Sequence, residues 1–163
     1  MKRFVEPDFP VPGGLETEEF RLRMLSVHDV VKDFDAVMAS APFLRMLFPG
    51  WGRWPEGLTL EQNLIDLGWH QKEFQRRRSF AYTVVAPDES RVVGCVYVVP
   101  SQREGYDAEV YFWARESAQG DAADSALAAA VMPWIESEWP FPRVAYPGRA
   151  IDWASWDKVA LKA

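Results

Sequence analysis

The sequence predicts one α+β domain, residues 1–163, in which a mixed and mostly antiparallel sheet is flanked by helices. Its length suits one domain with a sizeable core. The periodic segments follow the order β–α–α–β–β–β–α–β–α. In that order, two adjacent strands joined by a short polar turn predict an antiparallel hairpin, and a later strand–helix–strand unit makes the sheet mixed.

The first half of the chain predicts an irregular arm, one strand and two helices. Residues 1–14 contain three prolines and two glycines without periodicity. Thr17–Leu25 alternates apolar and charged side chains, which is typical of a half-buried strand. Capping boxes open helices over Ser26–Ala39 and over Thr59–Arg78. The second helix should bury one apolar stripe, formed by Leu60, Leu64, Leu67 and Phe74.

A long connection, Ala41–Leu58, joins the two helices and is rich in aromatic residues, proline and glycine. Connections of this length inside a compact domain often form lids or pocket walls. We therefore expect Phe48, Trp51 and Trp54 to line a substrate pocket. The alternative is that these rings seal the core beneath the connection.

The second half predicts a hairpin followed by a β–α–β unit. Residues of high β-propensity form three runs, and a later apolar face recurs at helical spacing through Leu127, Val131 and Ile135. The expected elements are strands at Phe80–Ala86, Arg91–Val99 and Ala108–Arg115, a helix through Ile135, a strand at Arg143–Tyr146 and a final helix at Ile151–Lys162.

Composition narrows the classes of function. Eighteen Lys and Arg against 24 Asp and Glu give a formal net charge of −6, which disfavours nucleic acid and favours a cationic substrate such as an amine. No apolar run approaches the length of a membrane span, and we expect a cytoplasmic protein with no membrane partner. Cys95 is the only cysteine, so the chain forms no internal disulfide.

Three stretches together resemble the GNAT superfamily of acyl-CoA-dependent N-acyltransferases. They are FRLRMLSVHDV, FAYTVVAPDESRVVGCVYVVP and AEVYFWARESAQGDAADSALAAAV, which match the first strand and helix, the central hairpin, and the fourth strand, turn and helix of that family. Gly94 lies where such hairpins commonly carry a glycine. The resemblance implies acetyl-CoA as co-substrate and transfer of the acetyl group to a primary amine of a small molecule or peptide.

In that family the turn after the fourth strand holds the coenzyme pyrophosphate on backbone N–H groups at a helix start. The family pattern, Gln/Arg-x-x-Gly-x-Gly/Ala, falls here on residues 119–124, where Ala122 replaces a glycine and Asp124 a small residue. Two carboxylates, Asp121 and Asp124, therefore lie where the pyrophosphate should approach. The resemblance assigns the coenzyme to Phe112, Ala114, Arg115, Gln119, Gly120, Asp121 and Ala122.

Glu109 is the candidate catalytic residue, because acyl transfer needs a neutral amine and hence a general base or a water relay. The resemblance places a carboxylate at this strand position in some relatives. Strand alternation puts Glu109, Tyr111 and Trp113 on one face and Ala108, Val110 and Phe112 on the other. The alternative is a strand carboxylate that forms an ion pair with an arginine.

The remaining candidates complete the predicted pocket. His70 on the second helix and Tyr111 on the fourth strand are expected to face the substrate, although His70 could equally be a helix histidine without a role. No histidine, cysteine or carboxylate spacing predicts a metal site. The tail contains Tyr146 and Arg149, which either contribute to binding or belong to a rigid aromatic platform.

Two interpretations of function remain open. One is the N-acyltransferase; the other is a non-catalytic GNAT-fold module that binds a ligand or dimerises. The altered turn favours the second, and so does the C-terminus, where Lys158 stands at the family's tyrosine position and the closing hairpin has no counterpart. Retention of Glu109, Gln119 and Gly120 favours the enzyme. A homodimer could cover the exposed sheet edge.

Overall fold

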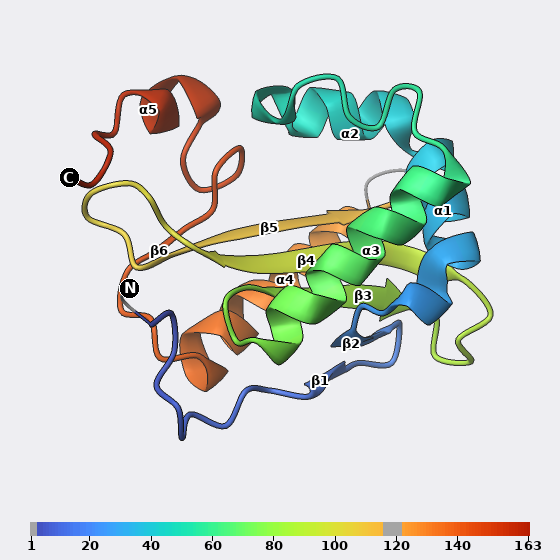
Figure 1. Cartoon of the computed structure of the whole chain (residues 1–163), viewed down its shortest axis with the longest axis horizontal. Coiled ribbons are helices and arrows are strands. Elements are labelled where there is room, and N and C mark those ends of the chain that lie inside the picture. The colour runs from blue at the N-terminus through green and yellow to red at the C-terminus, as the bar shows by residue number, and fades with distance from the viewer. Residues whose placement is uncertain (1–2, 116–121) are drawn as a thin grey trace.

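The computed structural model describes residues 3–115 and 122–163, and it has an α+β fold built on a six-stranded mixed sheet (Figure 1). The strands lie side by side in chain order. All neighbours are antiparallel except the last pair, which is parallel. The strands are β1 (Gly14–Glu16), β2 (Arg21–Met24), β3 (Phe80–Val85), β4 (Val92–Pro100), β5 (Ala108–Ala114) and β6 (Val144–Ala145).

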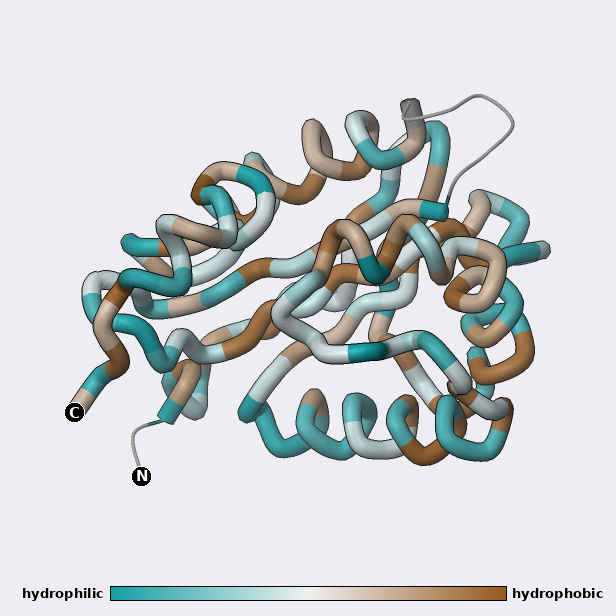
Figure 2. Tube along the Cα trace, turned by 90° about the horizontal axis from the view of Figure 1, so that it is seen from above, coloured by the Kyte–Doolittle hydropathy of each residue, from teal (hydrophilic) through white to brown (hydrophobic). Residues whose placement is uncertain are grey.

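Helices cover both faces of the sheet. Figure 2 shows the sheet between a layer that contains α3 and a layer that contains α4. None of the helices within residues 3–115 and 122–163 has both the length and the hydropathy of a membrane span. The helices are α1 (Val30–Ala39), α2 (Ala41–Leu47), α3 (Leu60–Gln75), α4 (Ala122–Glu138) and α5 (Trp153–Asp157), with 3₁₀ turns η1 (Val27–Asp29) and η2 (Pro49–Trp51).

The predicted α+β class and mixed sheet are confirmed, and each expected segment is present with changed limits. One strand, one α-helix and the 3₁₀ turn η2 were missed. Strand β1 lies at the end of the expected arm, and α2 occupies the first part of the expected loop, with Pro42 in its first turn, where the missing N–H costs nothing. The expected final strand and final helix are shorter, at two and five residues.

Strand β5 is buried on both faces and separates two apolar clusters. Val110 and Phe112 contact the cluster beneath α4, whereas Tyr111 and Trp113 contact the cluster beneath α1, α2 and α3. The predicted alternation along this strand is therefore correct. The same alternation turns Glu109 toward the side of α1 and α3, where the candidate site lies.

The predicted apolar stripe of α3 is wrong in part. Leu67 is buried, but Leu60 and Leu64 are 45% and 43% exposed. The inward face of α3 instead carries Asn63 and His70, which lie one turn before and one turn after Leu67. A polar inward face is tolerated because this face borders a cavity rather than close-packed core.

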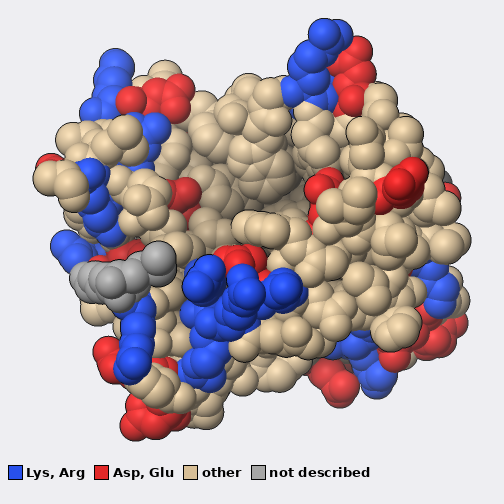
Figure 3. All heavy atoms as spheres, in the orientation of Figure 1, with Lys and Arg blue, Asp and Glu red and all other residues tan. Residues whose placement is uncertain are grey.

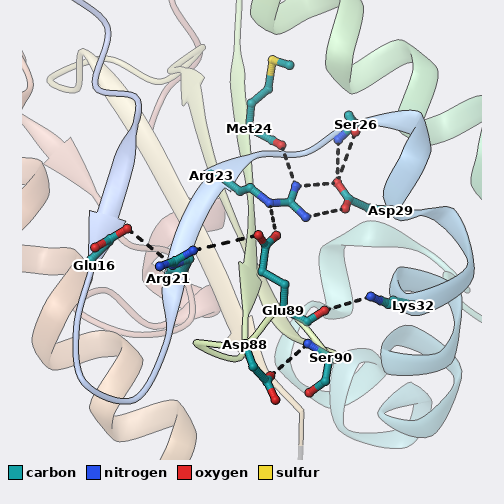
Figure 4. A network of polar contacts seen from close by, with 10 residues as sticks. All are labelled: Glu16, Arg21, Arg23, Met24, Ser26, Asp29, Lys32, Asp88, Glu89 and Ser90. Carbon is teal, nitrogen blue, oxygen red and sulfur yellow. Dashed lines mark hydrogen bonds and ion pairs between the residues drawn. The ribbon is translucent and has the colours of Figure 1, made fainter.

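A polar network fixes the start of α1 against the sheet (Figure 4). The Arg23 guanidinium on β2 donates to both carboxylate oxygens of Asp29 at 2.8 and 3.1 Å and to Glu89 in the β3–β4 turn at 2.6 Å. Asp29 also accepts from the Ser26 backbone N–H at 3.0 Å, as the predicted capping box requires. The network therefore holds α1, and the residues one turn further along it, over β4.

Gly94 is required by the close approach of β4 and β5. A Cβ at this position would lie 1.9 Å from the Trp113 carbonyl oxygen, which is a backbone atom that cannot rotate away. We expect Gly94→Ala to lower the free energy of unfolding by about 1 to 3 kcal/mol, because the central strand pair must separate. Denaturant titration measures the change.

Gly13→Ala is the matched control for this substitution. No atom lies within 4 Å of the added Cβ there, so the free energy of unfolding should change by about 0.5 kcal/mol or less. Equal effects of the two substitutions would contradict the assigned role of Gly94.

Candidate functional site

A cavity of about 580 Å³ opens between the α1–α3 layer and the sheet. It is bounded by α1, α3, the segment around η2, and the facing side of β4 and β5. Figure 3 shows a hollow on this face of the molecule, with walls that are mostly uncharged. Neither lysine nor arginine lines the cavity in the part of the chain that the structure describes. Its volume suits a small organic ligand.

Aromatic rings form one wall of the cavity. Trp51 packs edge-on against Trp54, Tyr97 and Tyr111, with ring centroids 5.6, 5.7 and 5.2 Å apart. Of the residues expected in the pocket, Trp51, Trp54, His70 and Tyr111 line it. Phe48 does not. It is buried behind the wall, stacked on Trp51 at 4.0 Å, and supports that ring from the core side.

Glu109 lies on the β5 side of the cavity and is held by two hydroxyl groups. Tyr111 Oη donates to one carboxylate oxygen at 2.6 Å, and Ser101 Oγ donates to the other at 2.9 Å. The expected alternative was an arginine partner, but both of these contacts come from hydroxyl donors. Burial, followed by the bond to Glu109, raises the pKa of Tyr111, so the phenol stays protonated and remains a donor.

A second carboxylate, Asp33 on α1, lies deep in the cavity wall. It is only 4% exposed, and Asn63 Nδ2 on α3 donates to its Oδ2 at 2.9 Å. Burial raises the pKa of Asp33 to about 6. Asp66, on the same face of α3, lies at the more exposed rim, and partial burial raises its pKa as well. The cavity therefore combines aromatic walls with three carboxylates.

His70 adds no positive charge to this cavity at neutral pH. Burial lowers its pKa to about 4, so the imidazole is uncharged above about pH 5. Its ring lies 5.3 Å from Tyr97 and 5.0 Å from Trp69. A neutral imidazole in this position leaves the negative charge of the carboxylates uncompensated.

Within residues 3–115 and 122–163, the outer edge of β5 has no strand partner beyond Glu109. The parallel partner β6 pairs only at Ala108 and Glu109. Along β5 the backbone groups of alternate residues face β4, as the bond from the Arg115 N–H to the Val93 carbonyl shows. Those of Phe112 and Ala114 therefore face the open edge. An open strand edge offers N–H and C=O groups to a ligand.

One side chain already occupies part of this edge. Arg149, which follows β6, donates to the Phe112 carbonyl at 2.7 Å and to both carboxylate oxygens of Asp124 on α4 at 2.8 and 2.9 Å. Its guanidinium also lies over the Phe112 ring, 3.7 Å from the centroid. Such a bidentate and stacked arginine is strongly held. It bridges α4 and the β6–α5 connection across the splayed strands.

The residues expected to bind the coenzyme lie at different places in the structure. Phe112 and Ala114 are buried on β5, with backbone groups at its open edge. Arg115 forms an ion pair with Asp35 on α1 at 3.0 Å. Ala122 begins α4. The other three, Gln119, Gly120 and Asp121, lie outside the described residues.

The sequence alone did not identify several residues of the cavity. Asp33, Asn63, Asp66 and Tyr97 line it, and Ser101 holds Glu109. On α3 a signal was present, because Asn63, Asp66, Leu67 and His70 recur at i, i+3, i+4 and i+7, which is one helix face. A polar helix face that also carries a buried leucine indicates that the helix borders a cavity. Ser101 carried no comparable signal.

The raised pKa of Asp33 predicts a stability that depends on pH. Its pKa in the folded state exceeds the unfolded value, so its contribution to stability is present below about pH 4 and lost as the pH rises through about 6. We expect Asp33→Asn to raise the free energy of unfolding by about 2 to 3 kcal/mol at about pH 7.5, because Asn63 keeps its acceptor and the buried charge is gone.

Chemical denaturation at several pH values measures this gain, which should disappear near pH 4. Asp35→Asn is the control on the same helix, since Asp35 is 69% exposed and its ion pair contributes about 1 kcal/mol or less. A gain for Asp33→Asn that is independent of pH would contradict the assignment.

Comparison with solved structures finds the same fold in acetyltransferases. A GnaT-family protein from Bordetella pertussis matches at a TM-score of 0.55 and 17% identity, over 77% of this chain and 73% of its own. RimL, the ribosomal L7/L12 α-N-protein acetyltransferase, in complex with coenzyme A, matches at 0.57 and 19%, over 78% and 66%. MccE, a microcin C7 self-immunity acetyltransferase with acetyl-CoA and AMP, matches at 0.55 and 11%, over 77% and 67%.

No protein-family model matches the sequence, and no curated protein is similar to it. At 11 to 19% identity, the structural likeness concerns the fold. The chain therefore has the fold of the GNAT acetyltransferases.

Proposed function

We propose that this protein is an N-acyltransferase that transfers an acetyl group from acetyl-CoA to an amine held in the aromatic cavity. The observation that carries the proposal is the position of Glu109. Its carboxylate lies in the cavity wall, oriented by Tyr111 and Ser101, on the last β5 residue that β6 pairs. The acceptor cavity and the open strand edge therefore meet at this residue.

Glu109 is the proposed base. An amine reaches the cavity mainly as an ammonium ion and must lose a proton before it attacks a thioester carbonyl. Glu109 accepts that proton directly or through a water molecule. Tyr111 and Ser101 hold both carboxylate oxygens, which limits the rotation of the group, and each oxygen keeps a further lone pair that can accept a proton.

The open edge of β5 offers hydrogen-bond donors that suit an acyl-CoA thioester. The backbone N–H groups of Phe112 and Ala114 face this edge and could stabilise negative charge on an acyl oxygen. When bound, the thioester supplies the activated acyl group. Two of the structures with the same fold hold coenzyme A or acetyl-CoA, which supports this co-substrate.

Arg149 conflicts with that fit and favours a second candidate function. Its guanidinium takes the Phe112 carbonyl and is neutralised by Asp124, so it neither leaves the edge free nor offers a charge to a phosphate. A non-catalytic domain that binds its ligand only in the cavity could keep this Arg149 bridge without losing ligand binding. The two candidates differ in whether acetyl-CoA binds and reacts.

Glu109→Gln tests the base. The amide keeps the size of the side chain but cannot take a proton, so we expect the rate of acetyl transfer to fall about 100-fold or more. The assay mixes the protein with acetyl-CoA and a panel of amines and follows thiol release and product mass. Glu104→Gln, in the exposed β4–β5 loop, is the control and should retain the wild-type rate. Wild-type turnover by Glu109→Gln would remove its assigned role.

Asp124→Asn tests the Arg149 bridge. The substitution removes a negative charge beside the open edge and releases the guanidinium, so acetyl-CoA should bind about five-fold more tightly, which corresponds to about 1 kcal/mol. Calorimetric titration measures the affinity, which for the wild type should be tighter than about 1 mM. The control is Asp88→Asn in the exposed β3–β4 turn, where the carboxylate accepts from the Ser90 N–H and does not contact Arg149. Absence of acetyl-CoA binding in both wild type and Asp124→Asn would favour the non-catalytic domain.

A further inference from the structure

The cavity carries carboxylates on two of its sides, Asp33 on α1 and Glu109 on β5. Glu109 lies opposite Val99, since these residues are paired in the β4–β5 register. Asp33 lies on α1, which packs over β4, and it lines the same cavity as Tyr97 and Val99 of that strand. Glu109 therefore reaches the cavity from the sheet, and Asp33 reaches it from the helix layer.

The space between these carboxylates is aromatic. Trp51, Trp54, Tyr97 and Tyr111 all line the cavity, and their rings offer apolar surface and negative faces to an alkyl ammonium ion. His70 is neutral and no basic side chain of the described residues lines the cavity, so none of these lining residues neutralises Asp33. Asn63 satisfies one of its oxygens and supplies no charge.

A buried carboxylate without a cationic partner lowers the stability of the folded protein and indicates that a ligand supplies the missing charge. The neighbouring Asp29 supplies no compensating charge to Asp33. The Asp29 carboxylate forms its own ion pair with Arg23, and its negative charge disfavours ionisation of Asp33. Asp66 at the rim adds to the negative potential at the cavity entrance.

We propose that the cavity binds an organic dication, a diamine in which one nitrogen lies at Glu109 and the second, charged nitrogen lies at Asp33, with the connecting chain between the aromatic rings. The cavity of about 580 Å³ has room for a short linear chain between the two nitrogens. The identity of the reacting nitrogen rests on the proposed function; the binding of the dication does not.

Calorimetric titration of the full chain with a series of linear diamines from 1,3-diaminopropane to 1,10-diaminodecane tests this inference. We expect affinity to peak at one chain length within the series and to fall on both sides, because a shorter diamine does not reach both carboxylates and a longer one must fold within the cavity. At the optimum length the diamine should bind at least about tenfold more tightly than the monoamine of equal chain length, because only the diamine reaches both carboxylates.

Asp33→Asn should remove this advantage, leaving the affinity for the monoamine within about two-fold of wild type. Asp35→Asn, on the same helix but paired with Arg115, is the control and should keep the diamine preference. The length dependence in the wild-type protein tests the inference independently of any variant.

The outcomes separate this inference from the proposed function. Equal affinities for diamines and monoamines, or no saturable diamine binding up to about 10 mM, would overturn the dication site. A diamine preference without acetyl transfer would support the dication site and overturn the proposed enzyme. Acetyl transfer to amines with no diamine preference would do the reverse.

Discussion

The arrangement of this molecule depends on the partial pairing of strand β5. The strand is buried on both faces, so its alternate side chains belong to two different apolar clusters. On its outer edge, β6 pairs with only Ala108 and Glu109, and the strands then separate. Backbone groups of the same strand are therefore satisfied within the sheet at one end and face an open edge at the other. The candidate base lies at the junction.

Electrostatics then distinguishes the two sides of β5. On the side of α1 and α3, Asp33 and Glu109 face a cavity without cationic lining residues in the described chain, and burial disfavours the ionised form of Asp33. At the open edge, Arg149 is paired with Asp124 and lies on the Phe112 ring. One side therefore lacks a cation and the other has already bound one. This asymmetry supports a cationic acceptor and makes Arg149 the main conflict with a coenzyme at the edge.

The positions of these charges follow from packing farther away. Arg23 joins β2, the start of α1 and the β3–β4 turn through Asp29 and Glu89, and thereby sets where Asp33 lies over β4. Trp153 Nε1 donates to the Leu47 carbonyl at 3.0 Å and so ties α5 to α2, next to the aromatic wall. Figure 1 shows α5 and α2 next to each other above β5, along that edge of the sheet. The cavity is thus framed by segments distant in sequence.

Much of the fold was determined by local pattern in the sequence. Alternation identified β5 and its two faces, capping boxes marked the starts of η1 and α3, and the order of elements predicted a mixed sheet. These features depend on residues close together in the chain. The helix α2 was missed because the proline and aromatic residues in its sequence also suit a loop. Its helical conformation is favoured by the burial of Leu44, which exists only in the folded chain.

The candidate site divides in the same way. Glu109 and the rings of Trp51 and Trp54 could be nominated from strand alternation and from an aromatic connection. The pairing of Arg149 with Asp124, 25 residues away, and of Asp33 with Asn63, 30 residues away, could not. Such partners are determined by how helices and strands pack against one another. The local periodicity of a sequence does not show which distant side chain a given charged residue will contact. The sequence determined the elements and their inward faces; the tertiary structure alone decided which charges are neutralised and which remain free for a ligand.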